Sequence, residues 1–185
     1  MAMEIRRFAV EVFGQAMLMH GLAESARRLT DYINEPTPYL HLTEVSTFPY
    51  SADSVVGLEK QRRGLVNKAS IVMVAEIEVE AAPTPAAVEM RVAKSAHRIL
   101  VYTSQFGINA DIHLTPGVEM TNFLAISPGR FVPVTNATVM PMLGGTQLTD
   151  FRRPFLLINR DQISYLGAAP EPAAAPTDPD DDTIG

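Results

Sequence analysis

The second half of this 185-residue chain restates the first half in the same order, and this repeat constrains the fold more than any other feature. The matched segments are 29–33 with 120–124 at a spacing of 91, 39–45 with 131–137 and 65–71 with 157–163 at 92, and Phe13 with Phe106 at 93. Polar positions match as well as apolar ones, for example Asn67 with Asn159. Because an alternating β-pattern alone does not require matching polar residues, we interpret the repeat as an internal duplication.

Each copy has the pattern of several short strands. Period-two runs of apolar residues predict strands over 8–13, 16–23, 39–47 and 64–78 in the first copy, and over 98–103, 109–114, 131–140 and 155–166 in the second. Between the second and third strands, residues 30–34 predict one helical turn, with Thr30 or Asp31 as its cap. The last predicted strand has a polar kink, Asn67-Lys68 in one copy and Asn159-Arg160 in the other.

This pattern predicts an all-β, mainly antiparallel fold. Four or five strands in about 70 residues bury little surface as an open sheet, and closure removes exposed strand edges. We therefore expect two tandem small β-barrels or strongly bent sheets. The expected divisions are a first module over 5–77, a linker over 78–95, a second module over 96–167 and a disordered acidic tail over 168–185.

Composition narrows the classes of protein that fit. The chain has no cysteine, which excludes disulfides, thiolate metal ligands and a cysteine nucleophile. The N-terminus lacks a signal-peptide pattern and the apolar runs are too short to span a bilayer, so we expect a soluble, cytoplasmic protein with no membrane contact. Five of the 21 acidic residues lie in the last 15 positions, which leaves 16 acids against 15 bases elsewhere. That near-neutral body disfavours strong nucleic-acid binding.

The segment Arg-Leu-Thr-Asp-Tyr-Ile-Asn at 28–34, the strand Tyr-Leu-His-Leu-Thr at 39–43 and the Asn-Lys pair before Ile71 together carry a family resemblance. They resemble Sm-like small β-barrels, in which Asp and Asn follow the second strand and a short polar-basic pair separates two apolar strand halves. They resemble still more closely an uncharacterised bacterial domain family with the pattern Arg-Leu-Ser-Asp-x-Leu-Asn, Phe-Leu-x-Leu-Thr-Asp-Ala and Val-Asn-Lys-x-x-Ile. The resemblance implies tandem Sm-like modules.

The candidate ligand or nucleotide contacts are polar residues in these motifs: Asp31, Asn34, Asn67, Lys68, Asn159 and Arg160. A cation and an amide beside a turn can hold a phosphate or a base edge. The alternative is structural, with the asparagine occupying a turn and the cation extending to water. Asp111 and His113 share a strand face and form a conceivable weak site, although a solvated face is the simpler interpretation.

No pattern of catalytic, metal-binding or cofactor-binding residues is recognisable, so we expect neither an enzyme nor a cofactor. The preferred function is a structural or interaction protein that assembles as a homo-oligomer or binds a protein partner. The alternative is weak RNA or nucleotide binding through the Asn-Lys and Asn-Arg turns. In that case, the replacement of Asp31 by Asn122 and of Asn34 by Ala125 would leave the first copy with the more complete site.

Overall fold

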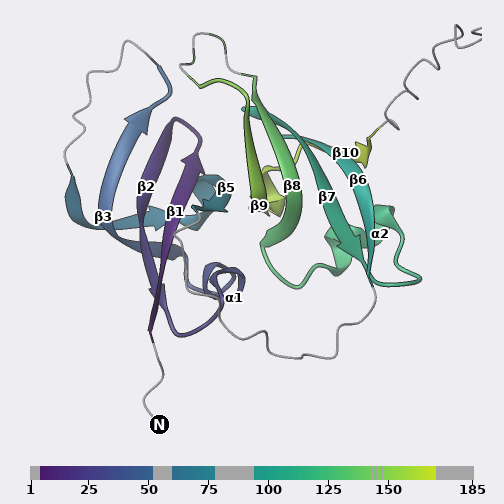
Figure 1. The fold of residues 1–185 in the computed structure, drawn as a ribbon, viewed down its shortest axis with the longest axis horizontal. Helices are drawn as coiled ribbons and strands as arrows, with labels where there is room; N and C mark the ends of the chain where they lie inside the picture. The colour runs from purple at the N-terminus through teal and green to yellow at the C-terminus, as the bar shows by residue number, and fades with distance from the viewer. Residues whose placement is uncertain are drawn as a thin grey trace, which may run out of the picture.

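The computed structural model describes residues 5–51, 60–77, 94–142, 144, 146 and 148–169 (Figure 1). The first half contains β1 (Arg6–Gly14), β2 (Met17–Ser25), α1 (Leu29–Ile33), β3 (Tyr39–Pro49), β4 (Gln61–Asn67), a 3₁₀ turn (Lys68–Ser70) and β5 (Ile71–Glu76). The second half contains β6 (Ser95–Tyr102), β7 (Phe106–Leu114), α2 (Met120–Ile126), β8 (Phe131–Pro141), β9 (Phe151–Asn159), a 3₁₀ turn (Arg160–Gln162) and β10 (Tyr165–Ala168). The two halves therefore have the same order of elements.

All ten strands belong to one antiparallel sheet, in the order β10-β6-β7-β8-β9-β5-β1-β2-β3-β4. The prediction of an all-β, mainly antiparallel fold is confirmed. The strand pairing does not, however, close either half into a barrel, because β10 and β4 remain as edges of the described sheet. The two small barrels are therefore not confirmed, and the halves share one continuous sheet because β5 of the first half pairs with β9 of the second. This pairing satisfies two strand edges at once.

Each half has its own hydrophobic core, and the two cores interlock at the β5–β9 ladder. Figure 1 shows two groups of curved strands with β5 and β9 between them. Side chains of β5 enter both cores: Val74 packs with the first half, whereas Met73 packs with the second. β5 is apolar without interruption because it is covered by a core on each face, and a strand covered on both faces has no polar side.

Backbone irregularities recur at matching places. Glu44 and Asn136, 92 residues apart in β3 and β8, have φ values of 53° and 51°. A register shift falls between His20 and Leu22 in the β2–β3 ladder, and another between Asn109 and Asp111 in the β7–β8 ladder. By these shifts, His20 in β2 corresponds to Asn109 in β7, which is 89 positions later in the chain. The two halves thus bend at corresponding positions.

Two sequence expectations need correction. Phe13 and Phe106 are not equivalent, because Phe13 is the second-last residue of β1 whereas Phe106 is the first residue of β7. Their rings instead meet edge-on, with centroids 5.9 Å apart. The strands predicted over 64–78 and 155–166 are each two strands separated by a 3₁₀ turn. The second half begins with β6 at Ser95 and ends with β10 at Ala168.

The tail beyond residue 169 and most of the linker lie outside the described residues. Of the helices that the structure describes, none is long and apolar enough to cross a membrane.

Candidate functional site: the joint between the halves

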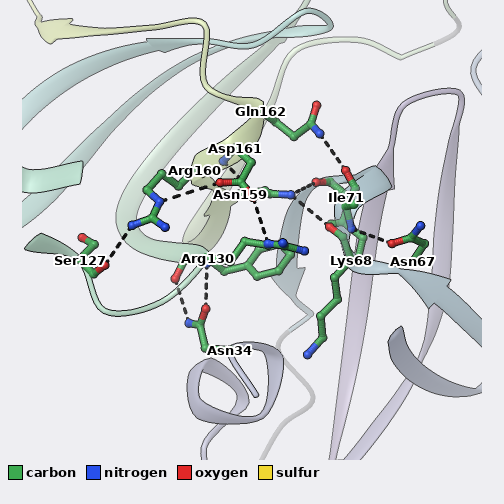
Figure 2. A network of polar contacts seen from close by, with 12 residues as sticks. Asn34, Asn67, Lys68, Ile71, Ser127, Arg130, Asn159, Arg160, Asp161 and Gln162 are labelled. Carbon is green, nitrogen blue, oxygen red and sulfur yellow. Dashed lines mark hydrogen bonds and ion pairs between the residues drawn. The ribbon is translucent and has the colours of Figure 1, made fainter. Parts of the chain in front are cut away.

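Most of the predicted site residues lie close to the joint where β5 and β9 pair, near the two 3₁₀ turns (Figure 2). The ladder aligns Met73 with Ile158 and Val74 with Leu157, and all four side chains are buried. Polar side chains bridge the halves at the end of this apolar ladder.

Asn159 is the central polar residue of the joint, and its side chain is completely buried. Its Nδ2 donates to the carbonyl oxygens of Lys68 at 3.1 Å and Ile71 at 2.7 Å, both in the other half. Its Oδ1 accepts from the backbone N–H of Asp161 at 3.1 Å. The whole carboxamide is therefore used to hold the two turns together, and no polar atom of it is left for a ligand.

Lys68 and Arg160 occupy corresponding positions and make corresponding hydrogen bonds to carbonyl groups. The Lys68 Nζ donates to the carbonyl of Glu35 at 2.8 Å and to Oγ1 of Thr37 at 3.2 Å. Arg160 Nη1 donates to the carbonyls of Leu124 and Ser127, each at 3.2 Å. Each cation thus satisfies carbonyl groups at or just beyond the C-terminal end of the short helix in its own half, where positive charge is favourable.

Charge around Lys68 is balanced by its neighbours. Burial lowers the pKa of the Lys68 ammonium from its ordinary value, Glu35 opposes this shift, and Arg130 adds to it. Arg130 itself pairs with Asp161 at 3.0 Å. Because Lys68 is almost fully buried, its charge is directed at the Glu35 carbonyl, just beyond α1, rather than at solvent.

Asn34 bridges the halves from the other side. Its Nδ2 donates to the carbonyl of Phe131 at 2.9 Å, and its Oδ1 accepts from the N–H of the same residue at 2.8 Å. The approach is so close that a Cβ at Gly129 would overlap the Asn34 carboxamide. Asn34 therefore behaves like an extra rung of β-pairing onto the start of β8, a role that the matching Ala125 has no side-chain amide to repeat.

The remaining predicted residues are exposed. Asp31 lies in the first turn of α1, whose N-cap is Arg28, so neither Thr30 nor Asp31 is the cap. The Asn67 Oδ1 accepts from the N–H of Ala69 at 2.9 Å, which caps its own 3₁₀ turn. The structure therefore gathers Asn34, Lys68, Asn159 and Arg160 around the joint, while Asp31 and the Asn67 amide face outward.

Glu11 and Arg153 form an ion pair across the joint that the sequence did not predict. Glu11 on β1 is buried, and its Oε2 lies 2.6 Å from Nε and 2.5 Å from Nη2 of Arg153 on β9. His20 Nε2 lies 3.5 Å from the other carboxylate oxygen. The pair joins residues 142 positions apart, and no local spacing could have indicated it.

Asp111 and His113 have separate partners. Asp111 accepts from Asn136 Nδ2 at 2.8 Å and from Arg98 at 3.0 Å, whereas His113 Nε2 contacts Thr135 Oγ1 at 2.8 Å. The Asn136 amide above all, and then Arg98, lower the pKa of Asp111 against the opposing effect of burial. Within the described residues, no group of three or more histidine or acidic side chains could hold a metal ion.

Each open edge of the sheet carries one large, exposed apolar side chain. Leu65 on β4 is 63% exposed and Tyr165 on β10 is 53% exposed. Beside β4 lies an open hollow of about 520 Å³, whose lining includes His41, Arg63 and Leu65. Unpaired strand edges with exposed apolar side chains can pair with another strand.

No protein-family model matches the chain, and searches of curated proteins and of solved structures found no significant match.

Proposed function

We propose that this chain is a non-enzymatic assembly protein, built from two duplicated Sm-like modules, that associates with further copies of itself head to tail. Duplication is supported by the shared strand order: β5-β1-β2-β3-β4 in one half corresponds to β10-β6-β7-β8-β9 in the other. The matching positive φ values at Glu44 and Asn136 add support, since such values are uncommon outside glycine.

The internal joint supplies the template for association. It pairs the fourth strand of the second half, β9, with the fifth strand of the first half, β5. The corresponding strands, β4 and β10, are the two edges of the described sheet. A second copy that repeats the joint would therefore place its β4 against β10 of the first copy. In the register of the internal ladder, Leu65 would face Leu166, and Val66 would face Tyr165.

The exposure of equivalent side chains carries the proposal. Leu65 is 63% exposed, yet its counterpart Leu157 on β9 is completely buried by the internal joint. Tyr165 is 53% exposed, whereas its counterpart Met73 on β5 is completely buried. The same position is thus buried where the edge is paired and exposed where it is open, and an open edge is a template for pairing with another chain.

The same relation extends beyond the two edge strands. Three further exposed residues have buried counterparts near the joint: Tyr39 with Phe131, Met17 with Phe106, and Met142 with Tyr50. Tyr50 of the first half packs edge-on against Phe106 of the second, with ring centroids 5.9 Å apart. Repetition of this contact between molecules would bring Met142 against Met17, which buries two exposed methionines together.

A joint of this kind is heterologous, because one molecule contributes β4 and the other contributes β10. Such contacts generate closed rings when the rotation closes and filaments when it does not.

The alternative function, nucleic-acid binding, gains no comparable support. Lys68 and Arg160 would have to leave their carbonyl partners before they could bind a phosphate.

The test is the molar mass in solution, measured by size-exclusion chromatography with light scattering across a concentration series. We expect a multiple of the 20.2 kDa chain mass. Leu65→Lys should shift the mass to that of one chain, because a charged side chain at an edge opposes strand addition. Ile5→Lys is the matched control, since Ile5 is as exposed as Leu65 but lies outside the open edges, and it should keep the wild-type mass.

A wild-type chain that stays a monomer at the highest concentration reached would refute the proposal. So would a Leu65→Lys variant that keeps the wild-type mass.

A further inference from the structure

We propose that Asn67 sets the register of the head-to-tail contact by donating its side-chain amide to the carbonyl oxygens of Arg160 and Ile163 in a second copy. This inference rests on the proposed function. Within the chain, Asn159 already makes this type of contact, since its side-chain amide donates to two carbonyl oxygens across the joint (Figure 2). The exposed Asn67 would do the same between two copies.

The donor is already arranged for this contact. Asn67 and Asn159 have similar backbone angles, φ −64° and ψ 117° against φ −70° and ψ 114°. Each Oδ1 accepts from the backbone N–H two residues later, at 2.9 Å for Asn67 and 3.1 Å for Asn159. The same bond fixes the orientation of both carboxamides. Asn159 Nδ2 then bonds across the joint, whereas Asn67 is exposed and its Nδ2 has no partner among the described residues.

The acceptor is arranged as well. Asn159 donates to Lys68 and Ile71, which begin and follow the first 3₁₀ turn. Arg160 and Ile163 occupy the same places in the second turn, and Ile163 has φ −78° and ψ 115° against φ −79° and ψ 129° for Ile71. In both turns the isoleucine N–H bonds to the carbonyl of the first turn residue. The second turn thus offers carbonyls like those that Asn159 binds.

A register contact is needed because the open ladder specifies its own alignment weakly. β10 has only four residues, including Gly167, and its partner strand would present Gly64 opposite that glycine. A slip of one residue exchanges the two faces of a strand, and short or glycine-containing strands resist such slips least. A buried amide that must meet two carbonyls penalises every other alignment.

Asn67 also stands alone in this role. Three side-chain amides bridge the turn region of the internal joint: Asn159, Asn34, and Gln162, which donates to the carbonyl of Ala69 at 2.8 Å. Their counterparts at the open edges are Asn67, Ala125 and Ser70. Ala125 has no amide, and the Ser70 hydroxyl already donates to the carbonyl of Asn67 at 2.8 Å.

The test is Asn67→Asp, which keeps the oxygen that caps the turn but replaces the amide donor with a second oxygen that faces two carbonyls. We expect the dissociation constant of the assembly, measured by analytical ultracentrifugation, to rise by at least about tenfold. Asn122→Asp is the matched control. It adds the same charge at an exposed position whose counterpart in the first half is Asp31, so it should leave the constant unchanged.

Asn67→Ser provides a second variant, because serine also caps a turn but carries no amide, and it should weaken assembly in the same direction. Far-UV circular dichroism verifies that each variant is folded. If both Asn67 variants assemble like wild type while Leu65→Lys does not, the register role is wrong and head-to-tail assembly stands. If wild type itself is a monomer, both proposals fall.

Discussion

Replacement of Asn159 by alanine should be among the more damaging single changes outside the hydrophobic cores. The residue lies at the end of β9, is completely buried, and forms three hydrogen bonds. Two of those bonds join the halves, so their loss weakens the joint itself. The matched change is Asn67→Ala, which removes the same carboxamide from the same type of turn at an exposed position.

The expected magnitudes follow from these bonds. A hydrogen bond contributes about 1 kcal/mol net to stability, and more when its loss leaves a buried partner unsatisfied. Three bonds at Asn159 therefore correspond to about 3 kcal/mol of unfolding free energy. The single bond of Asn67, with Ala69 in contact with water, corresponds to about 0.5 kcal/mol. For a chain of this size, the Asn159 change should lower the melting temperature by about 6–12 °C.

Both variants should be compared in the Leu65→Lys background, so that self-association does not add to stability. Urea unfolding followed by far-UV circular dichroism gives the two free energies of unfolding. This signal suits a chain that has no tryptophan. Equal losses for the two variants would refute the reasoning, because the difference between them depends entirely on burial and on the bonds across the joint.

Two further perturbations test the charged contacts. Arg153→Met should cost about 2 kcal/mol of unfolding free energy at neutral pH, because the buried Glu11 carboxylate loses its charged hydrogen bonds to arginine. Adding Glu11→Gln should restore part of the loss in the same urea assay. Asp111→Asn should be less stable than wild type at neutral pH, since the lowered pKa of Asp111 favours the folded state wherever this carboxylate is ionised. That deficit should disappear as the pH falls below the ordinary aspartate range and through the lowered pKa; a constant deficit across that range would contradict it.

Much of the local structure could be predicted from the sequence because it is encoded locally. Alternating apolar residues predicted the strands, and the segment at 30–34 predicted the helical turn that the structure places at Leu29–Ile33. The Asn-Lys and Asn-Arg pairs indicated a polar break, and both are 3₁₀ turns capped by the asparagine. The separation of the two strands at this break was not predictable. β4 lies at an edge of the sheet, whereas β5 lies in its middle, between β9 and β1.

The joint was missed because strand pairing between halves depends on contacts far apart in the chain. A signal was nevertheless present in the differences between the repeats. The β5 segment Ile-Val-Met-Val-Ala is apolar throughout, as a strand covered on both faces must be, whereas its counterpart in β10 contains Tyr165 and Gly167. The β4 edge carries Arg62 and Arg63 where β9 has Pro154 and Phe155. Charged residues are typical of edges.

The same comparison changes the meaning of the polar differences between the halves. The replacement of Asn34 by Ala125 suggested a ligand site that one copy had retained. The structure gives Asn34 another reason to differ, because only the first half presents this position to β8 of its own chain. A polar difference between the two halves therefore need not indicate a ligand site. In one half this surface pairs with a neighbour in the same chain, whereas the corresponding surface of the other half is an open edge, so matching positions have different surroundings although the order of elements is the same.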